Sequence, residues 1–286
     1  MRLWSWNLAG ARSLTHAVID HLKASDADVV LAQEVRRSVE SSGYLIVSPT
    51  DRQGVYPGDN SYFTAVLHRG DVAVTAEPAL APLTDAGWDQ LGVSVRGTIA
   101  AAKVTPTDAD PITVISVYCP WSGPGQSWQR GSGLVISEAN AHRVVSDISM
   151  LAEVIDKPDR HRILVAGDWN ILYGYGEDGS EYWAERYDTV FRRMDALGFV
   201  LCGPFAPDGG RQADPWPSNE LPESSRCVPT FHSSQRSPAE AQRQLDFVFA
   251  SKSISDGVMT RAVNDVASWG PSDHCVIEID LDTSCC

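Results

Sequence analysis

Side chains suited to metal and acid–base chemistry follow one apolar segment. Residues 162–170 read RILVAGDWN, so four apolar residues precede a glycine, a carboxylate and an amide. The apolar run predicts a buried strand. Asp168 and Asn170 are two residues apart and would therefore face the same way from its end. The alternative interpretation is a turn, because Gly, Asp and Asn are common turn residues.

Similar polar residues stand at five other predicted strand ends or adjoining loops. They are Asn7, Glu34, Tyr118, Asp246 and the pair Asp273 and His274. Each has a simple structural explanation when taken alone; Asn7 could cap a turn, and His274 could be a buried histidine with its hydrogen bonds satisfied. Together they supply the groups that a hard divalent cation and a general acid–base pair require. No Ser-His-Asp, Cys-His or P-loop pattern competes with this interpretation.

Apolar periodicity predicts the elements that must position these side chains. Helices are expected over 14–23, 137–155 and 181–197, the last closed by Gly198. Strands are expected over 3–6, 28–35, 44–47, 62–68, 72–76, 92–104, 112–118, 163–166, 199–201, 245–250, 260–266 and 275–281. Many strands with short connections indicate mixed or antiparallel sheets with helices outside, an α/β sandwich. The loops 120–133, 173–179 and 208–229 are expected to determine specificity.

Composition limits the class of protein. The 286 residues are 43% hydrophobic and 21% charged, which predicts a globular protein with a single domain over 1–286. The chain has no signal-peptide pattern and no apolar run that could span a membrane, so a cytoplasmic location is expected. The six cysteines lack zinc-ligand spacing and are expected to be reduced structural thiols.

The net charge of −14 argues against a protein that holds duplex nucleic acid mainly by neutralising phosphates. A phosphate substrate remains compatible with it, because a divalent cation bound by carboxylates inverts the local charge.

Six short motifs in chain order resemble the endonuclease/exonuclease/phosphatase superfamily, the DNase I-like fold. They are WNLAG (6–10), QEV (33–35), VYCP (117–120), GDWN (167–170), QLDFV (244–248) and SDHC (272–275). The wording around Thr230-Phe231 and over 193–199 is also similar to that family. The resemblance extends over essentially the whole chain and implies a four-layer α/β sandwich, with two packed mixed or antiparallel sheets flanked by helices.

The resemblance also implies roles for the motif residues. Glu34 would be the principal Mg²⁺ ligand, with Asn7 and Asp273 in or beside the metal shell and Mn²⁺ as an alternative ion. Asp168 would orient or deprotonate the attacking water. Asn170 and Tyr118 would hold the phosphate. His274, oriented by Asp246, would stabilise the transition state or move a proton.

The sequence departs from the family pattern at several positions. The loop after Tyr118 reads WSGP (121–124), without the histidine or asparagine of some nucleases; Gln126, Trp128 and Arg130 are candidates for that contact. Ala9 stands where some abasic-site nucleases carry an acid, and Gln244 stands where arginine is frequent. The signature of inositol-polyphosphate 5-phosphatases is absent, which argues against that branch.

Three functions fit these observations. The leading hypothesis is a Mg²⁺-dependent phosphodiester hydrolase acting on nucleic acid, with a DNA endonuclease or exonuclease that binds its substrate weakly as the favoured form. The second is a phosphatase or phosphodiesterase acting on a small-molecule, nucleotide or lipid phosphate ester, and the third is a non-catalytic binding module. Tryptophans in or near loops would either stack on bases or pack in the protein: Trp88, Trp121, Trp128, Trp169, Trp183 and Trp216.

Overall fold

Two six-stranded mixed sheets form the centre of the computed structural model, which describes residues 1–9, 15–47, 62–107, 109–120, 133–157, 160–174 and 179–283. Sheet A has the order β13-β14-β1-β2-β4-β3, with β1 (Arg2–Asn7), β2 (Val29–Val35), β3 (Leu45–Val47), β4 (Phe63–His68), β13 (Val258–Ala262) and β14 (Ile277–Leu281). Sheet B has the order β11-β12-β10-β9-β8-β5, with β5 (Ala73–Thr75), β8 (Ile99–Thr105), β9 (Ile112–Tyr118), β10 (Ile163–Asp168), β11 (Phe199–Gly203) and β12 (Asp246–Ser251).

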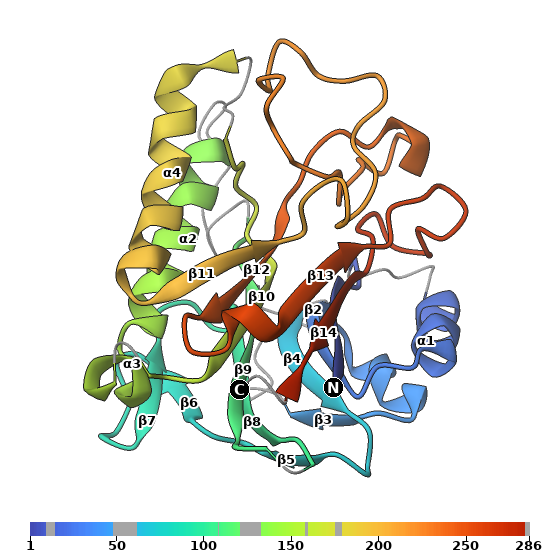
Figure 1. Cartoon of the computed structure of the whole chain (residues 1–286). Coiled ribbons are helices and arrows are strands. Elements are labelled where there is room, and N and C mark those ends of the chain that lie inside the picture. Colours follow the sequence, from blue (N-terminus) through green and yellow to red (C-terminus); the bar gives the residue numbers. More distant parts are fainter. Residues whose placement is uncertain are drawn as a thin grey trace.

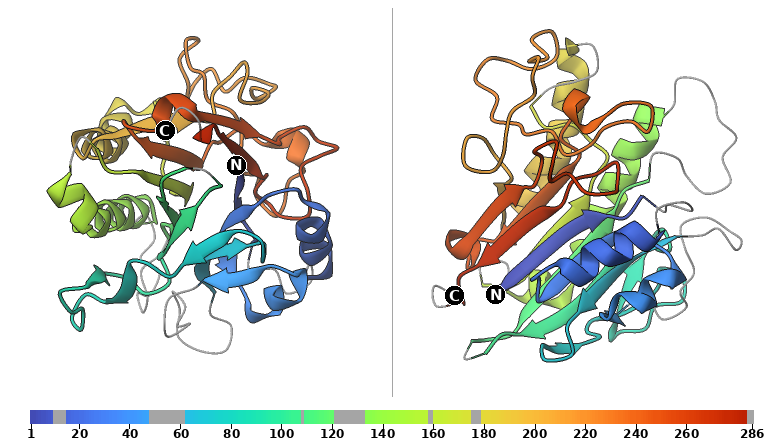
Figure 2. Two further views of the ribbon diagram at one scale, coloured as in Figure 1. Left: turned by 60° about the horizontal axis from the view of Figure 1, so that its bottom comes forward. Right: turned by 90° about the vertical axis from the view of Figure 1, so that its right-hand side faces the viewer.

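Helices cover the outer face of each sheet, so the expected α/β sandwich is confirmed (Figures 1 and 2). Helix α1 (Thr15–Ala24) covers sheet A, and α2 (Gly133–Ile148), α3 (Ala152–Asp156) and α4 (Glu181–Ala196) lie over sheet B. One apolar cluster lies between the sheets and one lies under each helical layer.

Strand β10 shows why the central strands are continuously apolar. Leu164 and Ala166 face the cluster between the sheets, whereas Ile163 and Val165 face the helices. Because side chains alternate along a strand, a strand buried on both faces needs apolar residues at every position.

The expected long strand over 92–104 is wrong. It comprises two strands, β7 (Gln90–Val93) and β8, and β7 pairs in parallel with β6 (Ala79–Pro82), a strand that was not expected. Between them the chain turns at Gly97, whose φ is +74°, and Ser94 binds the Asp147 carboxylate through its backbone N–H and its hydroxyl. Apolar alternation continues across this turn and therefore conceals it.

The single helix expected over 137–155 is also wrong. Helix α2 ends at Ile148 and α3 begins at Ala152. Ile148, Leu151 and Val154 nevertheless pack in the same cluster against sheet B, so the helical spacing of apolar residues persists through the break. The helix ending before Gly198 is confirmed, since α4 ends at Ala196 and Gly198 has a φ of +86°.

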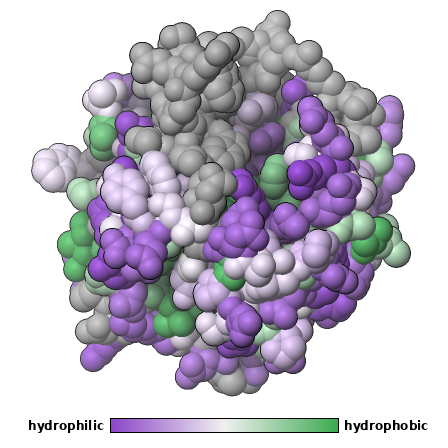
Figure 3. Space-filling model, turned by 90° about the horizontal axis from the view of Figure 1, so that it is seen from above, coloured by the Kyte–Doolittle hydropathy of each residue, from purple (hydrophilic) through white to green (hydrophobic). Residues whose placement is uncertain are grey.

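The end of the molecule where β10 finishes carries the long segment 204–245 (Figure 1). Seen from this end, the coloured surface is mostly hydrophilic with scattered apolar residues (Figure 3). Within the described ranges, no helix is long and apolar enough to cross a bilayer.

Candidate functional site

Polar side chains replace apolar ones at one end of the space between the sheets. Leu3 on β1 and Leu164 on β10 face the intersheet cluster, and the same alternation brings Asn7 and Asp168 to that side at the strand ends. The Asn7 Nδ2 donates to Asp168 Oδ2 over 2.9 Å, so this hydrogen bond joins the two sheets. Both side chains are almost fully buried.

A second polar contact between the sheets lies next to the first. Gln33 Nε2 on β2 donates to Ser116 Oγ on β9 at 2.9 Å, and that hydroxyl donates to the Ala32 carbonyl at 3.1 Å. Because buried polar groups must be satisfied, these bonds favour one relative position of the sheets.

Strained backbone positions three segments of the site. Among the described residues, Ala9, Glu34 and Asn170 are the only non-glycine residues with positive φ, at 58°, 51° and 48°. The register of β2 and β4 also shifts between Ala32 and Val35, so a bulge turns Glu34 out of the regular pleat. Backbone strain of this kind clusters at functional sites because the surrounding structure must hold it.

Three donors fix the Asp168 carboxylate. The backbone N–H of Asn170 donates to Oδ1 at 3.0 Å, and the side-chain amides of Asn170 and Asn7 each donate to Oδ2 at 2.9 Å. Burial raises the pKa of Asp168, and the nearby Asp246 and Glu34 carboxylates raise it further, against the opposing effect of His274.

His274 lies between two carboxylates. Its Nδ1 is 2.9 Å from Asp246 Oδ2, and its Nε2 is 3.8 Å from Asp168 Oδ2. Burial lowers the pKa of His274, but Asp246 and Asp168 outweigh it and raise this pKa, so the ring carries a proton at neutral pH. The Phe231 ring packs on the imidazole with centroids 4.9 Å apart and holds its plane.

Glu34 is a half-buried acid beside Asn7 and Tyr118. Asn7 Nδ2 lies 3.5 Å from Glu34 Oε1, and the Tyr118 hydroxyl also hydrogen-bonds this carboxylate. Burial raises the pKa of Glu34; His274 opposes this, and Asp273 adds to it. The carboxyl groups of Glu34, Asp168, Asp246 and Asp273 therefore surround a single imidazole.

This donor set fits a hard divalent cation. Ligand atoms of Asp168, Asp246 and His274 lie within 4.8 Å of one another. Asp246 and His274 Nδ1 engage each other and Asp168 accepts three hydrogen bonds, so the Glu34 and Asp273 carboxylates are the more available oxygen ligands for Mg²⁺. Excess buried carboxylate is the condition that a bound cation relieves.

The structure thus brings all eight expected site residues to one end of the sandwich. The amide oxygen of Asn7 accepts from the Ala9 N–H at 2.8 Å, and its nitrogen faces the carboxylates. A metal-ligand role for Asn7 remains a prediction; its oxygen accepts one hydrogen bond and has a second lone pair.

Several residues that support the site had no role assigned from sequence. Ser272 Oγ donates to the Asn7 carbonyl at 2.7 Å and connects the last motif to the first strand. Thr230 Oγ1 accepts from the backbone N–H groups of Leu245 and Asp246. Buried Gln244 accepts from Val228 N–H and donates to the Pro204 carbonyl, both at 3.0 Å. These residues lie in or next to the sequence motifs, but only the fold shows which groups they hydrogen-bond.

The tryptophans divide into different environments. Trp169 is fully buried, and its ring packs edge-on against Phe249, so a base-stacking role for it is wrong. Trp183 and Trp216 are partly buried against the core, whereas Trp88 is fully exposed. Trp121, Trp128, Gln126 and Arg130 lie outside the described residues, as do Cys285 and Cys286.

A family model for the Endonuclease/Exonuclease/phosphatase family matches residues 4–274. The chain belongs to this family. Members of the family hydrolyse phosphodiester bonds, and this chain is a phosphoesterase. No curated protein sequence matches the chain.

Solved structures of other proteins have the same fold. AP endonuclease LMAP from Leishmania major aligns with a TM-score of 0.62 and 17% identity over 98% of this chain and 87% of its own. The endonuclease domain of TRAS1, a telomere-specific non-LTR retrotransposon, aligns with a TM-score of 0.59 and 17% identity. The alignment covers 99% of this chain and 98% of that domain. The 3′-5′ exonuclease NExo from Neisseria meningitidis aligns with a TM-score of 0.58 and 17% identity. The alignment covers 99% of this chain and all of the exonuclease chain, at 100%. At 17% sequence identity, these structural similarities show that the proteins share a fold.

Proposed function

We propose that this family member is a Mg²⁺- or Mn²⁺-dependent phosphodiesterase that acts on nucleic acid, with DNA as the favoured substrate. The observation that carries the proposal is the buried Asp168, which is held by three donors and whose Oδ2 lies 3.8 Å from Nε2 of His274. A fixed acceptor beside a fixed cationic donor is the pairing that water attack on a phosphodiester needs.

The cation would be held by Glu34 and Asp273, with Asn7 beside them. The bulge at Glu34 directs that carboxylate toward Asn7 and Asp168, and Ser272 positions the loop that carries Asp273. When bound, the ion supplies Lewis-acid polarisation of the phosphoryl oxygens.

The remaining roles belong to the chain's own side chains. Asp168 orients the attacking water and accepts its proton. Asn170 and Tyr118 bind the phosphate, and His274 donates to the oxygen on which negative charge develops. Asp246 fixes the ring through Nδ1, so Nε2 remains the donor.

The names of the structural neighbours support DNA as the substrate class. They include an AP endonuclease, a retrotransposon endonuclease domain and a 3′-5′ exonuclease. One structure of the Neisseria protein is described as a 3′ phosphatase bound to product DNA hairpin.

A second candidate is a phosphate-ester hydrolase for a small molecule, nucleotide or lipid. The observation that favours it is the net charge of −14, which disfavours binding of long polyanions.

A cleavage assay separates these candidates. Supercoiled plasmid, linear duplex, single-stranded DNA and RNA would be incubated with Mg²⁺ or Mn²⁺, with and without EDTA. His274→Ala serves as the site variant. We expect nicking or degradation of DNA that disappears with EDTA and in the variant; the products would also show whether cleavage is internal or starts at an end.

If the protein cleaves no nucleic acid but hydrolyses a small phosphate ester, the second candidate function would replace the first. Cleavage that persists in EDTA would overturn the metal requirement.

A further inference from the structure

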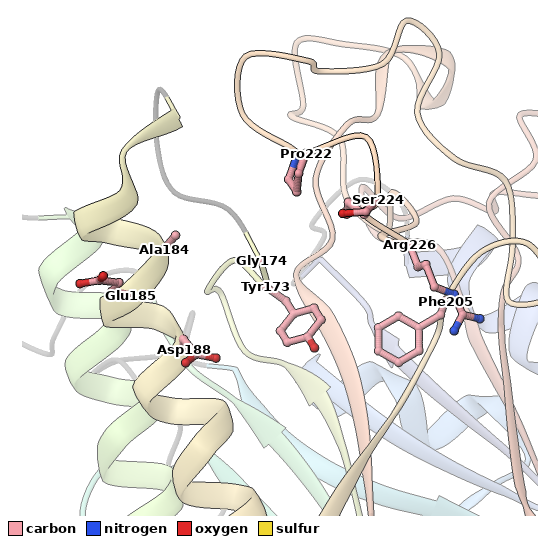
Figure 4. A pocket seen from close by; sticks show the side chains of 10 residues that line it. Tyr173, Gly174, Ala184, Glu185, Asp188, Phe205, Pro222, Ser224 and Arg226 are labelled. Carbon is pink, nitrogen blue, oxygen red and sulfur yellow. The ribbon is translucent and has the colours of Figure 1, made fainter.

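A cavity of about 610 Å³ opens between α4 and the segment 204–226 (Figure 4). Tyr173 contributes its ring and stands three residues after Asn170, so their Cα atoms are at most about 11 Å apart. The volume lies in the range typical of small-ligand sites. No role proposed above uses this cavity.

Aromatic rings form one wall of the cavity. The Tyr173 ring packs on Phe191 with centroids 4.8 Å apart and lies 6.0 Å from Phe205. The Arg226 guanidinium lies 5.6 Å from the centre of the Phe205 ring, and its Nε donates to the Ala206 carbonyl at 2.7 Å. Both rings are only partly buried, so a supported aromatic surface faces the cavity.

Polar groups line the cavity on the α4 side and at the loop. The Asp188 carboxylate extends from α4 toward Tyr173, while the Glu185 carboxylate points away from it (Figure 4). Asp188 Oδ2 pairs with Arg192 at 2.8 Å, which leaves Oδ1 to accept another donor. On the loop side, the exposed Ser224 hydroxyl points into the cavity.

We propose that this cavity binds a nucleobase with an exocyclic amino group, from a nucleotide next to the cleaved phosphodiester. This inference rests on the proposed nuclease function. Aromatic faces stack on any base, but a carboxylate accepts only from a donor. Adenine, cytosine and guanine carry an amino group that can donate to Asp188. Thymine offers only its N3–H, and the carbonyl oxygens on both sides of that N–H would meet the carboxylate unfavourably.

A short chain segment connects Asn170 of the site to Tyr173 of the cavity. Asn170 lies at the site and Tyr173 lines the cavity, so we expect the selected base to belong to a nucleotide close to the cleaved bond and not to a distant one. The expected consequence is a base preference at one position flanking the cleaved bond.

The test uses the full-length protein and single-stranded oligonucleotides that differ only in the base at each of the two positions on either side of the cleaved bond. The measured quantity is kcat/KM for each base. We expect an approximately tenfold preference for amino-bearing bases over thymine at one position. Asp188→Asn should reduce this preference to near unity, because an amide also donates to a carbonyl.

Asp195→Asn is the matched control, since it removes the same charge from an exposed position of the same helix and should retain the preference. Equal kcat/KM for all four bases, or a preference that Asp188→Asn leaves intact, would overturn the proposal.

A binding measurement keeps this test separate from nuclease activity. Saturation-transfer NMR in EDTA would compare dAMP with TMP on the wild-type protein, Asp188→Asn and Phe205→Leu. Contacts to the adenine ring that weaken in both variants support the cavity assignment, even if no nucleic acid is cleaved and the proposed function fails. Equal signals from dAMP and TMP in the wild type would contradict it.

Discussion

At the scale of single residues, the site depends on hydrogen bonds that hold acids in place. Asp168 accepts from Asn7 at the end of β1 and from Asn170 just after β10, and Asp246 holds His274. A carboxylate fixed in this way loses little freedom when it binds water, which is the advantage of a preorganised site.

Replacing Asp168 with Ala should lower kcat by about 10²–10⁴-fold, because it removes the group proposed to orient and deprotonate the attacking water. The measurement is initial rates on the best substrate, with the folded state confirmed by circular dichroism. Asp71→Ala, at an exposed turn, is the control and should keep the wild-type rate. A rate within threefold of wild type in the Asp168 variant would contradict this role.

Gly167 precedes Asp168 at a very close approach of two strands. A Cβ at this position would lie 1.9 Å from the Val117 carbonyl oxygen. Gly167→Ala should therefore destabilise the protein by roughly 1–3 kcal/mol and displace Asp168. Urea unfolding measures the loss; Gly70→Ala, where nothing lies within 4 Å of the added Cβ, should change stability little. Equal stability of the two variants would show that the strands separate without cost.

At the scale of elements, α1 packs a titratable ring against the outer face of sheet A. The His21 ring lies 5.0 Å from Trp6 and 5.7 Å from Trp4, between centroids. Burial lowers the pKa of His21 and also that of His142 on α2. Protonation of these rings therefore favours the unfolded chain, and their contribution to stability falls as pH decreases below about 6.5.

His21→Gln should weaken this acid dependence, because glutamine does not titrate. Midpoints of urea unfolding would be compared between about pH 7.5 and pH 5.5, a range that includes the ordinary histidine pKa. His16→Gln, exposed on the same helix, is the control and should leave the dependence unchanged. An identical pH dependence in His21→Gln and the wild type would exclude His21 as a source.

At the scale of the whole molecule, distant parts of the chain complete the same layers. Leu3 near the start and Ile279 near the end pair in adjacent strands and share the intersheet core. We infer that residues 1–286 fold as one domain, because neither half contains a complete sheet A.

The overall charge of −14 should make nucleic-acid binding weak without a metal. In EDTA, fluorescence anisotropy with a labelled duplex should give a Kd weaker than about 10⁻⁴ M at physiological salt. Addition of Ca²⁺, as a hard divalent ion, should strengthen binding in the wild type more than in Glu34→Gln. A micromolar Kd for the duplex in EDTA would contradict this expectation and indicate a local basic surface despite the negative net charge.

The sequence by itself determined most of the strands, the α/β sandwich and the identity of the clustered side chains. Strands such as β9 and β10 are mostly apolar on both faces because both faces are buried, and this pattern can be read from the local sequence. Polar residues such as Asp168 and Asp246 were recognisable because they stand at the ends of such strands. Six motifs in chain order then indicated the family, which the family match confirms.

Only the tertiary structure decided which groups meet and how they are held. The Asn7–Asp168 and Gln33–Ser116 bonds cross between sheets, so no local pattern contains them. Periodicity also failed at Gly97 and between α2 and α3, because apolar spacing continued through a turn and through a helix break. The burial of Trp169 and the cavity at Tyr173 depend on packing between segments far apart in the chain, and packing is a property of the folded molecule.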